Sequence, residues 1–167
     1  EQRARPVAIT YFEGTELGSE TLIIADASRN FWAYNPGGQL RLLSVSAPSG
    51  MQVTDIAAHG RDLYVLDAGS GSIIQFTTSE FGFQGGLKVV DNTTLANARR
   101  LTVDGEFFTA DEKGTVHRYS GQLELTLSQA GIDEPLVSAE TPQLLGNAGD
   151  IVLADSANDR LVVLKRD

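Results

Sequence analysis

The stretch that decides the fold is Gly149-Asp-Ile-Val-Leu-Ala-Asp-Ser-Ala-Asn-Asp-Arg-Leu-Val-Val-Leu164. Its first apolar run ends at Asp155, a short polar turn follows, and a second apolar run completes the pattern. Short apolar runs between turn signals are typical of buried β-strands. Equivalent runs end at Asp26, Asp67 and Asp111, so the four aspartates are separated by 41, 44 and 44 residues. This spacing predicts a repeat protein with one antiparallel sheet in each repeat.

The second and third repeats show the order of the strands most clearly. In the second repeat we expect strands at Val53–Ala58, Asp62–Asp67, Ser72–Thr77 and Leu87–Val90. The third repeat carries Asp104-Gly105 between two apolar runs. This dipeptide is a strong hairpin signal, because a type I′ turn needs positive φ at both central residues. Since the sequence also lacks a sustained 3.6-residue apolar period, it predicts an all-β protein.

These residues resemble the NHL-type repeats of β-propellers, in which an apolar strand, an Asp, a small polar turn and a second strand form the centre of each blade. The match is closest at residues 149–164, and Asp67-Ala-Gly-Ser-Gly-Ser-Ile-Ile-Gln-Phe76 is the next best. The resemblance implies an all-β propeller of about four four-stranded antiparallel blades, in a family whose rings usually have six. We expect one propeller domain or propeller fragment over residues 1–167, with repeats at approximately 7–50, 51–95, 96–139 and 140–167.

The predicted last repeat stops after its third strand, so the sequence leaves the closure of the ring open. The chain can be a fragment of a longer propeller. It can also form a four-bladed ring, in which an N-terminal strand such as Val7–Phe12 completes the last blade. A third arrangement is a homodimer in which two chains build an eight-bladed ring. An unclosed run of blades exposes sheet faces and a sheet edge, and each of these three arrangements would cover them.

The recurring aspartates are predicted to be structural. A carboxylate at the end of a strand can accept hydrogen bonds from backbone N–H groups of the following turn. An enzyme needs its catalytic carboxylate once, whereas each blade needs a turn cap. We therefore interpret four residues as turn caps and assign no catalytic residue: Asp26, Asp67, Asp111 and Asp155.

Composition narrows the classes of partner. The formal net charge is −9, with 13 basic and 22 acidic residues. An acidic surface repels phosphate backbones, so we expect no nucleic-acid partner. No apolar run reaches the length of a membrane span, so we expect no membrane insertion,. The absence of cysteine excludes disulfides and thiolate metal sites but does not fix the compartment,. The runs Val53–Ala58 and Leu63–Asp67 resemble propeller ectodomains of bacterial signalling enzymes, so we expect an extracytoplasmic or secreted module, as in a larger bacterial protein.

The one acidic cluster with metal-binding chemistry lies in the last turn. Asp155, Asn158 and Asp159 are weak metal candidates, although their spacing does not fit an EF-hand loop,. We expect no cofactor, while a surface calcium ion would be compatible with this turn. The two histidines, His59 and His117, have no Ser or Asp partner at a diagnostic spacing, so we expect no catalytic triad,.

The predicted connection Ala130–Pro142 is longer than the link between the first two repeats and is the first choice for a specific contact surface. It carries three weak candidate ligand-binding residues, Asp133, Glu134 and Glu140, and loops carry function more often than strands do,. The sequence therefore favours a non-catalytic binding or sensing module whose ligand is a protein, a peptide or a glycan. The alternative is a metal-dependent hydrolase or lyase of the propeller type that has part of its site outside this chain.

Overall fold

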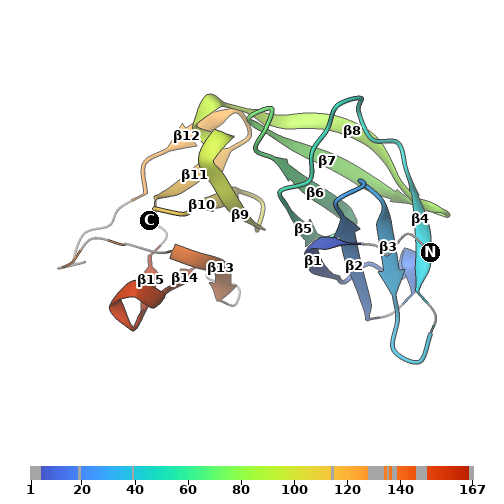
Figure 1. Ribbon diagram of the computed structural model, residues 1–167, viewed down its shortest axis with the longest axis horizontal. Helices are drawn as coiled ribbons and strands as arrows, with labels where there is room; N and C mark the ends of the chain where they lie inside the picture. Colours follow the sequence, from blue (N-terminus) through green and yellow to red (C-terminus); the bar gives the residue numbers. More distant parts are fainter. Residues whose placement is uncertain are drawn as a thin grey trace. The chain divides into compact units, whose positions relative to one another are not determined.

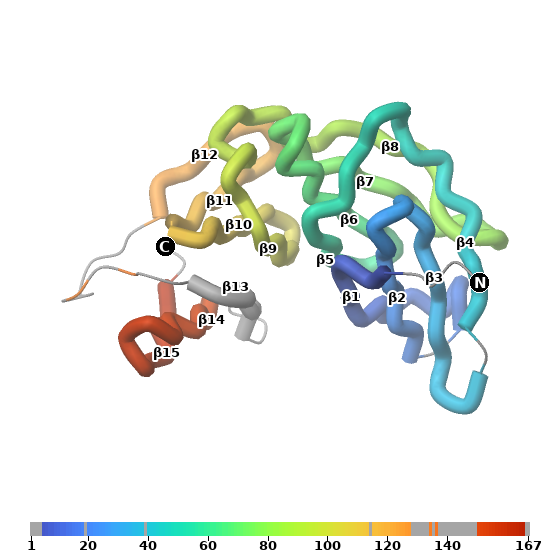
Figure 2. The backbone as a smooth tube through the Cα atoms, in the orientation of Figure 1, coloured from blue at the N-terminus to red at the C-terminus, as the bar shows by residue number. Residues whose placement is uncertain are grey.

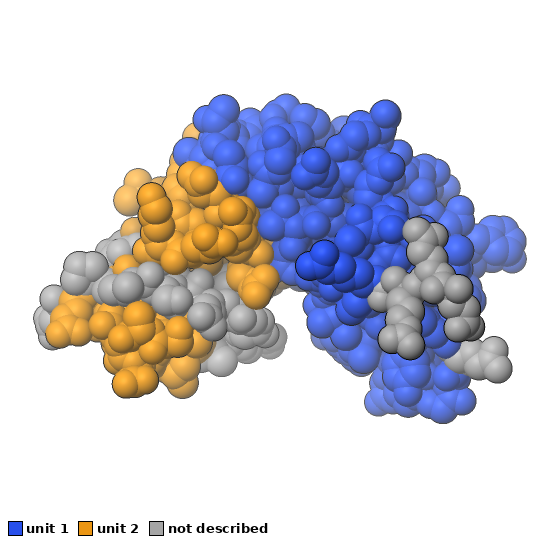
Figure 3. All heavy atoms as spheres, in the orientation of Figure 1, with its two compact units in different colours: residues 1–96 blue, residues 97–167 orange. Residues whose placement is uncertain are grey.

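The computed structural model describes residues 5–18, 20–38, 40–113, 115–127, 134, 136, 139–145 and 150–165, with the backbone alone described for 139–145. These residues form fifteen strands and a few short 3-10 turns. The prediction of an all-β protein is therefore confirmed. The chain divides into two compact units, residues 1–96 and residues 97–167, which Figure 3 colours separately. Each unit is described by itself.

The first unit consists of two antiparallel meanders, which we call blade 1 and blade 2 (blue to green in Figures 1 and 2). Blade 1 consists of β1 (Pro6–Phe12), β2 (Thr21–Asp26), β3 (Phe31–Tyr34) and β4 (Arg41–Val45). Blade 2 consists of β5 (Asp55–His59), β6 (Asp62–Asp67), β7 (Ser72–Ser79) and β8 (Gly82–Asp91). Within each blade every strand pairs with the next one along the chain, as expected for a hairpin-connected repeat,.

The second unit contains blade 3 and the described part of blade 4 (yellow to red in Figure 1). Blade 3 consists of β9 (Ala98–Val103), β10 (Phe107–Asp111), β11 (Val116–Ser120) and β12 (Leu123–Leu125). Blade 4 consists of β13 (Ala139–Leu145), β14 (Asp150–Asp155) and β15 (Arg160–Leu164). Both follow the same antiparallel order as the blades of the first unit.

Two details differ from the sequence predictions. Strand β8 starts at Gly82, well before the predicted Leu87–Val90, and pairs along β7 with two register shifts. Val7–Phe12, the segment that one of the alternatives uses to complete the last blade, lies in β1 and pairs with β2 as the first strand of blade 1. The reason is packing: Ala8 and Phe12 are buried in the core of the first unit, which fixes β1 as the first strand of blade 1,.

The outer strands of blades 1 and 2 are joined to each other. Ser44 of β4 pairs in parallel with Gly82 of β8, and the Ser44 N–H donates to the carbonyl of Phe81 at 3.0 Å. Gly82 has a φ of +149°, and a Cβ atom at this position would overlap the carbonyl oxygen of Ser44. A glycine is therefore needed for the close approach that turns the two blades into one eight-stranded sheet,.

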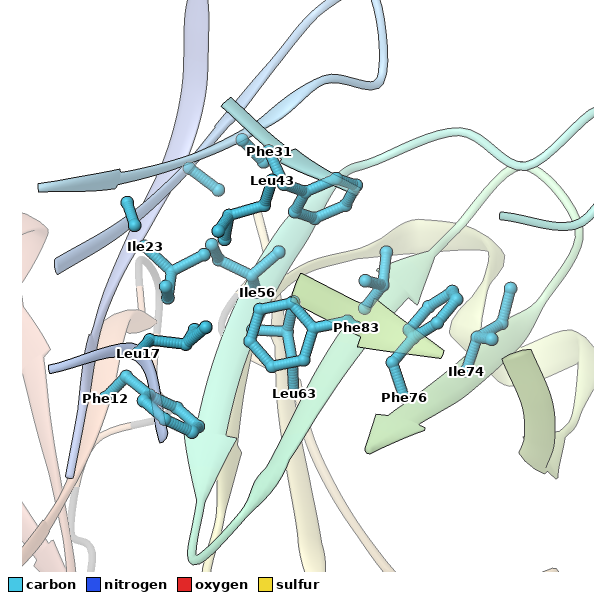
Figure 4. Close-up of a cluster of buried hydrophobic side chains, with 14 of the residues drawn as sticks. Phe12, Leu17, Ile23, Phe31, Leu43, Ile56, Leu63, Ile74, Phe76 and Phe83 are labelled. Carbon is cyan, nitrogen blue, oxygen red and sulfur yellow. The ribbon is translucent and has the colours of Figure 1, made fainter. Parts of the chain in front are cut away.

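The core of the first unit lies between its two blades (Figure 4). Successive side chains of a strand point to opposite faces, so each blade has two faces. In blade 1, residues one and three positions before the turn aspartate enter the core; in blade 2, residues two and four positions before it do so. These residues are Ala25 and Ile23 of blade 1, and Val65 and Leu63 of blade 2. We call the face of a blade that holds the residues one and three positions before the aspartate its forward face. The face that holds the residues two and four positions before the aspartate is its backward face.

The second unit follows the same rule. Its buried cluster joins the forward face of blade 3 to the backward face of blade 4. The forward face supplies Phe108 and Ala110, which stand three and one positions before Asp111. The backward face supplies Ile151 and Leu153, four and two positions before the next turn aspartate. The parity of a residue relative to its turn aspartate thus decides which neighbouring blade it packs against.

Candidate binding surface at the aspartate turns

Asp26 accepts hydrogen bonds through both of its carboxylate oxygens. Its Oδ1 accepts the backbone N–H groups of Ser28 at 2.8 Å and Asn30 at 2.9 Å. Its Oδ2 accepts the Asn30 side-chain amide at 3.0 Å and the Trp32 indole N–H at 3.2 Å. Burial raises the pKa of Asp26, but these hydrogen bonds outweigh burial and leave the pKa below its ordinary value,. The carboxylate therefore holds both the turn and the following strand.

Asp67 and Asp111 accept backbone donors in the same way. Asp67 Oδ1 accepts the Ser70 N–H at 3.1 Å. Asp111 Oδ1 accepts the N–H groups of Lys113 and Thr115, both at 2.8 Å. Each of these carboxylates thus spans the turn that leads into the next strand of its own blade.

Asp155 uses side-chain donors. Its Oδ2 accepts Asn158 Nδ2 and Arg160 Nε, both at 2.9 Å, and the residue is completely buried. Asp159 precedes the arginine with a left-handed φ of +49° and an exposed side chain. Two of the three weak metal candidates, Asp155 and Asn158, are therefore bound to each other, and Asp159 stands apart from them in solvent.

Arg160 also joins this turn to the long acidic connection. Its Nη2 donates to the backbone carbonyl of Glu134 at 2.5 Å, across 26 positions of the sequence. Leu136, two residues further, is buried in the same cluster as Val162. The Glu134 backbone and the Leu136 side chain are thus both held by this part of blade 4, while the Glu134 side chain is exposed.

The other two predicted contact residues are placed differently. Asp133 lies outside the described residues. Glu140 lies in β13, where its backbone pairs with Ala154 of β14, and only its backbone is described. Of the three predicted acidic residues, Glu134 is therefore the one whose side chain the structure describes.

The histidines occupy unrelated positions in different units. His59 ends β5 on an exposed hairpin. His117 Nδ1 lies 2.7 Å from Glu124 Oε1, and the imidazole stacks on Tyr119 with a centroid distance of 6.2 Å. The pairing with Glu124 was not foreseen from the sequence, because the two residues meet only through the β11–β12 hairpin.

The part of the chain that the structure describes contains neither a metal-binding cluster nor a membrane-spanning helix. Within the ranges that the structure describes, no three His, Asp or Glu side chains lie close enough together to hold a metal ion. No described helix has the length and apolar character needed to cross a bilayer.

No protein-family model and no curated protein sequence matches the chain. Among solved structures it is similar to a nidogen/laminin complex, with 15% identity, a TM-score of 0.61, and 96% of this chain and 65% of that one covered. It is similar to YCF48 bound to a D1 peptide, at 12% identity and a TM-score of 0.58, covering 92% of this chain and 49% of that one.

A streptogramin B lyase structure matches at 13% identity and a TM-score of 0.58, covering the whole of this chain and 56% of that chain. The chain thus spans about half to two thirds of the length of these structures. Identities this low show the fold alone. Together with the four aspartate turns and the alternating faces of the blades, they show that this chain has a β-propeller fold,.

Proposed function

We propose that this chain is a non-catalytic binding or sensing module of the propeller type. The observation that carries the proposal is the fixation of two neighbouring residues, Glu134 through its backbone carbonyl on Arg160 and Leu136 in the core. Because its backbone is held in this way, Glu134 presents its exposed side chain with little loss of backbone conformational entropy on binding,. Pre-organised loops on a rigid scaffold are a common form of recognition surface.

The charge of the surface favours one kind of partner. Glu134 and Asp159 have exposed carboxylates, and each belongs to or adjoins a residue of the hydrogen bond between Arg160 and the Glu134 carbonyl. The whole chain carries a net charge of −9. Such a surface attracts lysine and arginine side chains and repels phosphates. We therefore favour a protein or peptide segment with basic side chains over a glycan, in an extracytoplasmic setting.

Two of the similar structures support a binding role without fixing it. One is a complex of YCF48 with a D1 peptide, and another is a complex of nidogen with laminin. In both, a chain similar in fold to this one belongs to a complex with a peptide or with another protein. Because the streptogramin B lyase has the same fold, the fold by itself does not distinguish binding from catalysis,.

Surface plasmon resonance with three designed decapeptides tests the proposal. One peptide is rich in lysine and arginine, one is rich in glutamate, and one is neutral. We expect the basic peptide alone to bind, with an affinity that falls as salt rises. The double variant Glu134→Gln/Asp159→Asn should weaken this binding at least several-fold.

The matched control is Glu13→Gln/Glu80→Gln, which removes the same charge from exposed positions of the first unit. This control should bind like the wild type. Equal binding of all three peptides would contradict a specific surface around the hydrogen bond between Arg160 and the Glu134 carbonyl. An equal loss of peptide affinity in both double variants would contradict it as well.

A further inference from the structure

The connection between β1 and β2 reaches across to blade 2. It contains the 3-10 turn η1 (Thr15–Leu17), which lies against β7 although both of its neighbouring strands belong to blade 1. We call residues 14–18 the strap. Leu17 is buried in the core of the first unit, where Figure 4 draws it at the same end as Phe12. The strap therefore covers one end of the core between the two blades.

A glycine stands at each end of the strap. Gly18 has a φ of +106° and a ψ of 161°, a conformation that residues with a side chain rarely adopt,. A Cβ atom on Gly14 would lie 2.4 Å from the Phe12 ring, so glycine is needed for the strap to lie over this ring. Because glycine also has the greatest backbone freedom, the same two residues can act as hinges.

Two side chains tie the strap to the rest of the first unit. Leu17 supplies the buried apolar contact. Glu16 Oε1 pairs with Arg61 Nε, at 2.5 Å, in the turn between β5 and β6. We call this ion pair the latch. The Arg61 side chain is 67% exposed, so solvent screens the latch and its contribution is small,.

Thr78 lies at the covered end of the core and opposes closure of the strap. It is the last buried residue of β7, and its backbone N–H donates to the carbonyl of Arg61 at 3.0 Å. Its hydroxyl is buried and has no hydrogen-bond partner among the described residues. Burial of a hydroxyl in this way is costly, and access to water removes the cost. Closure thus gains from Leu17 and loses at Thr78, which brings the closed and open states near each other in free energy.

We propose that the strap is a hinged lid that opens while blades 1 and 2 stay folded. Opening breaks the latch, withdraws Leu17 from the core and admits solvent to the Phe12 ring and the Thr78 hydroxyl. The strand pairs of β1 with β2 and of β4 with β8 survive this motion, because they involve no residue of the strap. A condition that weakens the latch, such as high salt, shifts the lid toward its open state.

Cysteine labelling tests the lid, because the chain has no cysteine and each variant then carries a single thiol. Thr78→Cys places the thiol under the strap, and Ala25→Cys places it in the same core beside the Asp26 turn. With excess maleimide under native conditions, Thr78→Cys should react about tenfold faster or more, since labelling of Ala25→Cys requires the blades themselves to open. Equal labelling rates would overturn the proposal.

The latch is tested in the Thr78→Cys background. Adding Glu16→Gln should raise the labelling rate about two- to fivefold, as expected for loss of an exposed ion pair. The matched control is Glu112→Gln, which removes the carboxylate of the exposed pair with Arg99 in the second unit and should leave the rate unchanged. An unchanged rate in Glu16→Gln, or an equal rise in the control, would overturn the role of the latch.

Hydrogen exchange gives the same answer without a cysteine, if circular dichroism shows that Thr78→Cys does not fold. The Gly18 N–H donates to the Thr15 carbonyl at 3.1 Å inside the strap. In Glu16→Gln its exchange should be about two- to fivefold faster than in the wild type, while the exchange of the Ala25 amide in β2 stays the same. Unchanged exchange at Gly18, or an equal rise at Ala25, would overturn the proposal.

Discussion

Arg160 Nε lies 2.9 Å from Oδ2 of Asp155, and the aspartate side chain is fully buried while the arginine side chain is 26% exposed. A buried carboxylate is costly unless donors compensate for its lost hydration. Arg160 and Asn158 supply these donors from the same turn. Removal of the Arg160 donor leaves a buried charge without its partner, whereas removal of the Asp155 carboxylate also removes that charge,.

Asp155→Ala should destabilise the protein by about 2 kcal/mol, because it removes a charge-assisted hydrogen-bond network from a buried position. Arg160→Leu should destabilise it at least as much, since it leaves the carboxylate without its cationic partner. Urea unfolding followed by circular dichroism measures both effects. The exposed pair of Arg99 and Glu112 is the control, and Glu112→Ala should cost about 0.5 kcal/mol or less,. Equal losses at both pairs would contradict the role of burial.

The pKa of Asp26 predicts a pH-dependent contribution to stability. Because this pKa is lowered in the folded state, the carboxylate stabilises the fold fully above the ordinary pKa of an aspartate, and this contribution is lost as the pH falls through the lowered value,. Asp26→Asn should thus lower the free energy of unfolding near neutral pH and make it less dependent on pH in the acidic range. The fluorescence of Trp32, the single tryptophan, reports on this turn. Parallel pH profiles for the two proteins would speak against this prediction.

Two buried threonines should respond in opposite ways to replacement by valine. Thr109 is fully buried, and its hydroxyl has no hydrogen-bond partner among the described residues. Thr109→Val should therefore stabilise the protein by about 1 kcal/mol. Thr21 Oγ1 donates to the Gly18 carbonyl at 2.8 Å and accepts the Asn35 amide at 2.6 Å. Thr21→Val should destabilise by a similar amount in thermal melts, and effects of the same sign would refute the assignment.

Gly82→Ala should open the junction between β4 and β8. The new Cβ would overlap the Ser44 carbonyl in a backbone conformation that favours glycine, and we expect a loss of about 2 kcal/mol or more,. Gly50 also has a positive φ, of +81°, but nothing lies within 4 Å of its Cβ position. Gly50→Ala should therefore cost only about 1 kcal/mol. A Gly50 variant as unstable as the Gly82 variant would show that conformation alone, and not contact, decides the cost.

Calcium should not stabilise the last turn. The Asp155 carboxylate already accepts two donors through Oδ2, and Asp159 is exposed. We expect the same melting temperature after dialysis against a chelator and after addition of millimolar calcium. A calcium-dependent rise that disappears in Asp159→Asn, together with stoichiometric metal in elemental analysis, would contradict this prediction and assign a surface calcium site to the turn.

Local patterns in the sequence were sufficient to predict most strands. Strand β6 lies at the predicted Asp62–Asp67, because an apolar run bounded by a turn and an aspartate leaves little freedom. Strand β8 was predicted too short, because Gly82, Gly85 and Gly86 weaken any strand signal that composition can give,. Its pairing with β4 depends on a contact between distant segments that no local pattern encodes.

The candidate site was predictable only in its parts. The acidic connection and the last aspartate turn were both recognised as unusual, but as separate features. Their link through Arg160 spans 26 positions and exists only once both segments are folded. The exposure of Ile9 and Leu161 was not predictable for a similar reason. An apolar residue in a strand gives no sign of which face it occupies until the register is known,.

The seam between β4 and β8 has a consequence for the dynamics of the first unit. Blades that touch only through side chains can open one at a time, whereas blades that share backbone hydrogen bonds lose them together,. The amide protons of β2 and β6 should therefore exchange with solvent in one cooperative event, as though the two blades were a single foldon. An opening motion that separates blade 1 from blade 2 must first break this backbone seam.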